Sequence, residues 1–318
     1  MVSIVIPTRN RVDDLKSCLD SLIPQLDEAD ELIIIDNCST DNTKHVLSSF
    51  AKSTSQFKIL VDCENNLAKL FNIGWRASSN QIISFLNDDT IPDKKWLSEV
   101  KKWFEILPGA HIIGGPTRDH IDRRIRQEQS KLGLFFRLYD IFVMEGKLFD
   151  IFVLTDYGAY SIGDNFPDHP IEVDSLTITN MSAKREILES LGGFDEAFQY
   201  ANIDGEFFLR ARRACKKIYA VPTAGVDHYP SPIGSTRSAF FLARDSAIFY
   251  SKMHPTTVKH KFLLRLNVAS FFLFWFMRAR VEGPGVLFNA MRGYREGLRV
   301  AKLANKKHSL RDIHRLKI

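Results

Sequence analysis

The sequence predicts an α/β protein with a mostly parallel sheet, helices on both faces of that sheet, and amphipathic helices at the C-terminal end. Three observations predict this class. Short apolar runs alternate with segments of helical periodicity over the first 115 residues, which is typical of strand–helix–strand units. The first run, residues 2–6, is almost entirely apolar, as expected of a strand buried on both faces. The chain of 318 residues is 45% hydrophobic, so it can bury a large core.

The elements of the first part follow in a regular order. In the first helix Leu15, Cys18 and Leu22 recur at helical spacing, and the next helix has a cap-like start at Ser39. The expected strands are 2–6, 31–36, 57–62, 81–86 and 111–115, and the expected helices are 12–23, 39–50, 67–78 and 93–107.

The chain beyond residue 115 is less regular. Residues 118–170 are rich in charged and aromatic side chains and show no clear period. From residue 172 we expect a strand and then a helix that ends at the glycine pair 192–193. The helix 201–214 carries acidic residues in its first turn, where the helix dipole favours carboxylates. A short strand pair is expected to end at His228.

Polar side chains follow three of the expected strands. They are Thr8 and Arg9 after the first strand, Asp36 at the end of the second, and the run Asn87, Asp88 and Asp89 after the fourth. In sheets of this class, ligands bind beyond the carboxyl ends of the strands. The two adjacent carboxylates repel each other unless something opposes their charge, and the candidates are a metal ion, a basic side chain or solvent.

Several motifs occur together in a fixed order. They are VSIVIPTRNR, LIIIDNCSTDNT, ISFLNDDTIPDKKWL, GGFDE, IDGEFFLRAR and HYP. In this combination the chain resembles the family 2 glycosyltransferases over roughly residues 2–255. The resemblance implies the GT-A fold and inverting transfer from a nucleotide-sugar donor. The sequence contains neither a Walker loop nor a G-x-G-x-x-G motif.

The resemblance implies a domain division. Residues 1–255 would form the catalytic domain, with a nucleotide-binding half at 1–115 and an acceptor-binding half at 116–255. Residues 256–318 would form a basic amphipathic helical tail.

The resemblance also assigns the donor site. The loop Pro7, Thr8 and Arg9 would enclose the base, and Asp36 would read the base edge. Asp88 would bind the ribose, and Asn87 stands where the family often has Asp. The residues Lys69 and Asn72 are expected near the diphosphate. Asp36 has an alternative interpretation as a helix N-cap.

A divalent cation, Mn²⁺ or Mg²⁺, is the implied cofactor. Such a cation stabilises the charge of a departing diphosphate, and carboxylate oxygen and imidazole nitrogen suit it as ligands. Asp89 is the candidate for direct metal contact, and His228 resembles the histidine that completes the metal site. The alternative is a histidine packed against Tyr229 and Pro230.

An inverting transfer needs a base for the acceptor hydroxyl. By its place in the motif IDGEF, Asp204 matches that base and Glu206 the second acid. Ile203 replaces the usual Glu. The alternative is that both acids only stabilise the start of the helix.

The charge of the chain is unevenly distributed. From Lys259 to the end there are 14 basic and three acidic residues, a net charge of +11, so the rest of the chain carries −6 of the total of +5. The apolar run 268–277 is much shorter than the roughly 20 residues that span a bilayer. We expect an interfacial tail on an anionic membrane, or helices that pack on the protein.

Cysteine use and the N-terminus favour a cytosolic protein. The residues Cys18, Cys38, Cys63 and Cys215 have no zinc or redox spacing, so four reduced thiols are expected. The N-terminus does not resemble a signal peptide. The predicted location is therefore cytoplasmic, peripheral on the inner face of the cell membrane.

The sequence thus predicts a metal-dependent transferase that uses a nucleoside-diphosphate sugar, with a UDP-sugar as the expected donor. The acceptor would be a glycan or a lipid-linked glycan. No nucleic-acid partner is expected, and an oligomer is possible. The alternatives are a non-catalytic nucleotide-sugar-binding subunit, favoured by Asn87 and Ile203, and a nucleotidyltransferase.

Overall fold

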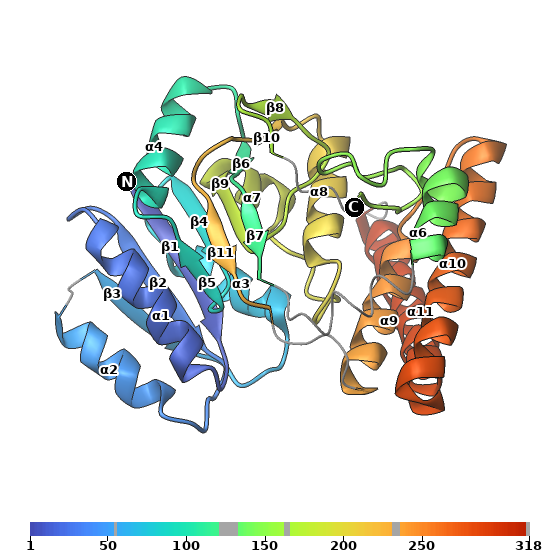
Figure 1. Cartoon of the computed structure of the whole chain (residues 1–318), viewed down its shortest axis with the longest axis horizontal. Helices are drawn as coiled ribbons and strands as arrows, with labels where there is room; N and C mark the ends of the chain where they lie inside the picture. The colour runs from blue at the N-terminus through green and yellow to red at the C-terminus, as the bar shows by residue number, and fades with distance from the viewer. Residues whose placement is uncertain (54–55, 121–132, 162–165, 231–235, 316–318) are drawn as a thin grey trace.

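The computed structural model describes residues 1–53, 56–120, 133–161, 166–230 and 236–315. It is an α/β structure with one large sheet, a small second sheet and a group of C-terminal helices at one side (Figure 1). The strands are β1 Val2–Thr8, β2 Glu31–Asp36, β3 Phe57–Val61, β4 Ile82–Leu86, β5 Thr90–Pro92, β6 Ile112–Gly114, β7 Thr117–Asp119, β8 Ile171–Glu172, β9 Asn180–Lys184, β10 Ile218–Ala220 and β11 Val226–His228. The helices are α1 Val12–Leu22, η1 Ile23–Gln25, α2 Thr43–Ser53, α3 Leu67–Ala77, α4 Trp96–Ile106, α6 Gly133–Tyr139, η2 Asp140–Met144, α7 Arg185–Leu191, α8 Ile203–Arg213, α9 Thr236–Ser251, α10 Val258–Glu282 and α11 Pro284–Arg315.

The large sheet has the strand order β3-β2-β1-β4-β9-β6-β10-β8. The strands β3, β2, β1 and β4 are parallel, and so is the pair β6 and β10, whereas β9 and β8 run antiparallel to their neighbours. The prediction of a mostly parallel sheet in an α/β fold is confirmed. The reversed strand β9 lies between β4 and β6, where its Ser182 hydroxyl bonds Ser84 of β4.

Alternating side chains of β1 fill two cores, one on each face of the sheet. Ile4 and Ile6 pack with residues of α1 and α4, and Val5 packs with residues of α3, α7 and α8. All of these β1 side chains are fully buried. A strand buried on both faces must be apolar on both sides, which explains why β1 and β2 were readable from the sequence.

The small sheet contains β5, which follows β4 in the chain, paired with β11. Its order is β5-β11-β7, with Thr90 of β5 opposite His228 of β11. The backbone N–H of Tyr229 donates to the carbonyl of Asp89 at 2.9 Å. The strand that ends at His228 was expected, whereas β5 and β7 were not predicted, because they are too short to show a period. The pairing of β5 with β11 brings the two proposed metal ligands together.

The C-terminal helices form a packed group. The helix α9, which was not predicted, lies along α11. A side chain at Gly293 or Gly297 of α11 would meet the backbone of Phe240 or Arg244 of α9, so the two helices approach as closely as glycine allows. The tail therefore packs on a helix that the prediction assigned to the catalytic domain.

The helix α10 continues through Arg265 and Asn267, so it is longer than the predicted apolar run. Among the described residues it is the one helix long and apolar enough, by length and composition, to cross a membrane. Its Asn267 is buried, accepts a hydrogen bond from the Tyr139 hydroxyl at 2.8 Å and donates to the Tyr157 carbonyl at 3.3 Å. These bonds attach α10 to the segment 139–157.

The cysteine prediction is wrong for one pair. Cys38 and Cys63 form a disulfide, whereas Cys18 is a buried thiol and Cys215 an exposed one. The pairing follows from strand register. Asp36 of β2 lies opposite Val61 of β3, and each cysteine comes two residues later, so parallel neighbours place the two side chains side by side.

Candidate active site

A cavity of about 410 Å³ lies beyond the carboxyl ends of β1, β2 and β4, as the sheet topology predicts. Elements far apart in the sequence form its wall. The lining residues are Pro7, Thr8, Arg9, Arg11, Asn37, Asn65, Leu67, Leu70, Asn87, Asp88, Asp89, Gln199, Tyr200, His228 and Pro230. The cavity thus contains the predicted loop after β1, the predicted acidic run and His228.

One end of the cavity is built from Arg9 and two amides. The Arg9 guanidinium donates to the side-chain oxygens of Asn37 and Asn65, at 3.1 Å each. The Asn37 amide donates to the carbonyls of Asp62 and Glu64. These bonds connect the loops that follow β1, β2 and β3, so the wall is fixed before any ligand binds.

The structure places Asp36 outside this cavity wall. Its carboxylate is buried, and one oxygen accepts the backbone N–H of Ser39 at 2.9 Å, as in the cap-like alternative. The other oxygen has no hydrogen-bond partner in the structure. The neighbouring residue, Asn37, lines the cavity instead, because successive residues at a strand end point to opposite sides.

A basic side chain opposes the two adjacent carboxylates. The Arg11 guanidinium pairs with both Asp88 and Asp89, and the Thr8 hydroxyl donates to Asp88 at 2.8 Å. Burial raises the pKa of Asp88 to about 6, although Arg11 and the Thr8 bond act in the opposite direction. Burial also acts to raise the pKa of Asp89, but His228 and Arg11 outweigh it and hold that pKa below its usual value.

The imidazole of His228 lies between two carboxylates. Its Nε2 atom is 3.3 Å from Asp89 Oδ1, and its Nδ1 atom is 2.7 Å from Asp119 Oδ1. Burial lowers the pKa of His228, but the two carboxylates more than offset this and raise it to about 9. Asp119 thus orients the ring in the way that carboxylates orient metal-binding histidines.

The donor set at this point fits a divalent cation in part. Asp89 Oδ1 is buried without a hydrogen bond and faces an imidazole nitrogen. Oxygen and nitrogen ligands of this kind suit Mn²⁺ or Mg²⁺. Among the described residues, no group of three or more His, Cys, Asp or Glu side chains is arranged to hold a metal. The phosphates of a ligand would therefore have to complete the coordination.

Asp204 lies at the start of α8 and does not line the cavity. Its carboxylate accepts the backbone N–H of Gly205 at 2.9 Å. Burial raises its pKa, while backbone N–H groups, including that of Ile178, act to lower it. Thr179, the residue after Ile178, accepts a hydrogen bond from the Asn87 side-chain amide through its hydroxyl, at 3.2 Å. The segment 178–179 therefore connects Asp204 to the acidic run.

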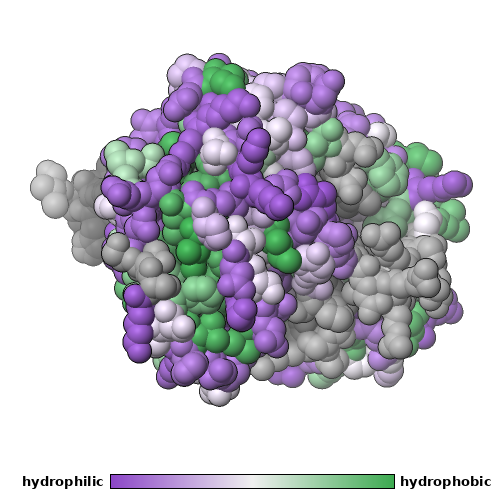
Figure 2. Space-filling view, turned by 60° about the vertical axis from the view of Figure 1, so that its left-hand side comes forward, coloured by the Kyte–Doolittle hydropathy of each residue, from purple (hydrophilic) through white to green (hydrophobic). Residues whose placement is uncertain are grey.

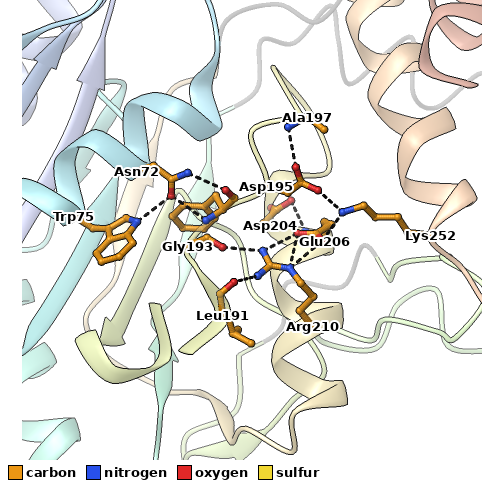
Figure 3. Close-up of polar contacts among 12 residues, drawn as sticks. Asn72, Trp75, Leu191, Gly193, Asp195, Ala197, Asp204, Glu206, Arg210 and Lys252 are labelled. Carbon is orange, nitrogen blue, oxygen red and sulfur yellow. Dashed lines mark hydrogen bonds and ion pairs between the residues drawn. The ribbon is translucent and has the colours of Figure 1, made fainter. Parts of the chain in front are cut away.

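Two other predicted residues also lie outside the cavity wall. Lys69 pairs with Asp62 at 2.9 Å and with Glu64 at 2.8 Å. Asn72 is buried, and its amide bonds both the N–H and the carbonyl of Phe194. Figure 3 shows Asn72 beside Trp75 and the turn at Gly193. Asn72 holds this turn in place.

Glu206 is buried and belongs to a partly exposed ionic network (Figure 3). It pairs with Arg210 at 2.8 Å and with Lys252 at 2.7 Å, and Lys252 also pairs with Asp195. The Arg210 guanidinium donates to the carbonyls of Leu191 and Gly193. The network ties α8 and Lys252, the residue after α9, to the turn after α7, which gives Glu206 a structural position.

The family model for Glycosyl transferase family 2 matches residues 3–162, half of the chain. This match contains the whole N-terminal part of the cavity wall.

The chain belongs to glycosyl transferase family 2.

Curated relatives agree with this family membership. Glycosyltransferase AglE of Haloferax volcanii is 30% identical over 144 residues, which is 44% of this chain and 44% of that protein. The O-antigen biosynthesis protein RfbC of Myxococcus xanthus is 24% identical over 80% of this chain, but over 19% of its own length. The matches therefore span less than half the length of these relatives.

Solved structures share the fold at low sequence identity. The mannosyltransferase PcManGT from Pyrobaculum calidifontis, in complex with GDP-Man and Mn²⁺, has a TM-score of 0.55 and 16% identity, covering 97% of this chain and 79% of that one. TarS of S. aureus in complex with UDP-GlcNAc has a TM-score of 0.57 and 13% identity, covering 96% and 92%. The expected GT-A fold is confirmed.

This family 2 member also contains site residues that the sequence reading missed. Arg11 and Asn37 line the cavity, and Asp119 bonds His228. Arg11 lies in the quoted PTRNR motif, so a signal existed. Asp245 of α9 is fully buried, and its Oδ2 atom accepts the backbone N–H groups of residues 199, 200 and 201. No sequence motif pointed to it.

Proposed function

We propose that this family 2 member is an inverting, metal-dependent glycosyltransferase. It would transfer a sugar from a nucleoside-diphosphate sugar, with a UDP-sugar as the first candidate, to a glycan or lipid-linked acceptor. The main support is the cavity beyond the strand ends, where Asp89 and His228 face each other beside a wall of hydrogen-bonding side chains.

The two ends of the cavity would hold different parts of the donor. The end with Arg9, Asn37 and Asn65 offers polar groups to a base and ribose. At the other end Asp89 and His228 would hold Mn²⁺ or Mg²⁺, which stabilises the negative charge of the departing diphosphate. His228 must lose its proton to bind a cation, so metal binding competes with the ion pair between His228 and Asp89.

Asp204 is the proposed general base. In a single displacement the acceptor oxygen forms a bond to the anomeric carbon, the bond from that carbon to the diphosphate breaks, and Asp204 receives the acceptor proton. A raised pKa brings a carboxylate closer to the working pH and suits it to accept a proton. The diphosphate leaves on the opposite face.

Two observations favour a second candidate function. Asp204 does not line the cavity, and the acidic run begins with the neutral Asn87. A non-catalytic subunit that binds a nucleotide sugar would show the same cavity.

Calorimetry of UDP, GDP, dTDP and CDP, each with Mn²⁺, Mg²⁺ or chelator, tests the donor site. We expect one nucleotide to bind in a metal-dependent way, and Asp89→Ala to weaken nucleotide and metal binding together. Asp204→Asn should keep nucleotide binding and lose transfer by about 100-fold or more. As a control, Asp20→Asn alters an exposed carboxylate of α1 and should change neither.

The outcomes separate the two candidates. Binding without turnover in the unmodified protein, with any sugar tested, supports the non-catalytic subunit. Absence of nucleotide binding contradicts both candidates. Near-full transfer by Asp204→Asn would show that another group is the base.

A cytoplasmic position, peripheral on the inner face of the cell membrane, belongs to the same proposal. Exposed cations of α11 support it, and they are Arg292, Arg295, Arg299 and Lys302.

A further inference from the structure

We propose that a groove between α6–η2 and α10 binds the hydrocarbon chain of a lipid-linked acceptor. This inference rests on the proposed glycosyltransferase function and adds a binding site to it. The groove has a volume of about 490 Å³. Its lining is almost wholly apolar, and the lining residues are Leu134, Phe135, Leu138, Tyr139, Phe142, Val143, Phe262, Leu266, Ser270, Leu273 and Met277.

The α10 wall of the groove is a regular stripe. Its residues recur every three or four positions from Phe262 to Met277, so they lie on one side of the helix. Large apolar side chains on both walls are exposed. Leu134 is 72% exposed and Phe262 63%. In soluble proteins such a continuous apolar surface marks a binding site for a protein, a membrane or an apolar ligand.

The groove adjoins a second, open cavity. This adjacent cavity, of about 220 Å³, has Phe135, Tyr139 and Ser270 in common with the groove lining. Its lining also includes Tyr160 and Tyr250.

One lining residue of the adjacent cavity, Tyr160, contacts the start of α8. The Tyr160 hydroxyl donates to the Asn202 side chain at 2.7 Å, and Asn202 is the residue before α8. A side chain at Gly205 would meet the Tyr160 ring. Tyr160 therefore lies between the adjacent cavity and the first turn of α8, which contains Asp204. A chain in the groove would point its polar end toward that turn.

Charge at the rim favours a lipid phosphate over a second copy of the protein. Arg137 of α6 and the α10 residues Lys261 and Arg265 are exposed near the groove. A lipid-linked acceptor carries phosphate between its hydrocarbon chain and its glycan, so these cations complement it. A second copy would bring its own basic tail, of net charge +11, against the same cations.

Figure 2 offers a contrast on another side of the molecule. The face seen there is largely hydrophilic. Its most continuous apolar group is a narrow band between polar side chains, and smaller apolar groups lie at the edges of the view. The helices α6 and α10, which line the groove, lie at the opposite side of Figure 1 from α1 and α2.

Binding of farnesyl phosphate to the full-length protein tests the proposal, by calorimetry below the concentration at which this lipid forms micelles. Leu273→Gln introduces an amide into the groove and should weaken binding about tenfold or more. Phe276→Gln is the matched control, since Phe276 is 51% exposed and Leu273 50%, but Phe276 lies outside the groove lining. Ser270→Phe places a large ring where the two cavities meet, and it should also weaken binding.

The possible outcomes have distinct meanings. Equal loss in Leu273→Gln and Phe276→Gln, or no binding of farnesyl phosphate, overturns the groove proposal. A dimer in sedimentation that Leu273→Gln dissociates and Phe276→Gln does not would assign the groove to a second copy instead. Loss of vesicle binding in Leu273→Gln, with farnesyl phosphate binding unchanged, would reduce the groove to general membrane contact. Nucleotide calorimetry on the same samples reports separately on the proposed function, so the two failures are distinguishable.

Discussion

The buried carboxylate of Asp245 holds the loop that forms one wall of the cavity. It accepts three consecutive backbone N–H groups, and Gln199 and Tyr200 of this loop line the cavity. Burial raises the pKa of Asp245 despite these bonds. The carboxylate therefore acts on the donor site without touching it, as a positioning residue.

We predict that Asp245→Ala lowers the free energy of unfolding by about 3 kcal/mol, because buried donors lose a charged partner. It should also raise the KM for the donor more than it lowers kcat. Asp245→Asn keeps an acceptor oxygen and should restore most of both losses. Chemical denaturation and steady-state kinetics measure these effects. If Asp245→Ala and Asp245→Asn had the same KM and the same kcat, Asp245 would have a purely structural role.

Single residues differed in how far the sequence revealed them. The run Asn87, Asp88 and Asp89 was readable because charged groups directly after a buried strand are unusual. Which of Asp36 and Asn37 lines the cavity was not readable from the sequence, because it depends on the direction in which each side chain leaves the end of the strand. The contact of Arg11 with the acidic run depends on how the loop after β1 folds, which no local pattern specifies.

At the scale of elements, glycine sets the distance between α9 and α11. We predict that Gly297→Val destabilises the protein by about 1–3 kcal/mol, since the new side chain would meet the Arg244 carbonyl at a packed interface. Gly109→Ala is the control, because a side chain there meets nothing within 4 Å, and its effect should stay within about 0.5 kcal/mol. Thermal unfolding compares the two. Equal stability would mean that the helices can separate without cost.

Elements with a strong local pattern were predicted, and those defined by their partners were not. The strands β1, β2 and β4 are apolar and buried, so their sequences alone identified them. The short strands β5 and β7 exist because β11 pairs with both. The strand β9 was expected, but its direction and its place between β4 and β6 depend on the long connection before it.

At the scale of the whole molecule, the uneven charge predicts membrane binding. We expect the full-length protein to co-sediment with vesicles of anionic lipid at low salt and to release as salt screens the charges. Replacing Arg292, Arg295, Arg299 and Lys302 with Gln should abolish most of this binding and leave nucleotide affinity unchanged. Binding that is insensitive to salt and to these changes would point to the apolar groove instead. A truncation is unsuitable, because α11 packs on α9.

The position of β9 has a consequence for synthesis of the chain. β4 and β6 each find a partner in β9, so both keep an open edge until residue 184 has left the ribosome. Open edges pair readily with other chains. The matched family segment, which ends at residue 162, therefore lacks a strand from the middle of its own sheet. We expect a fragment cut there to aggregate, and the nascent protein to need protection until the reversed strand arrives.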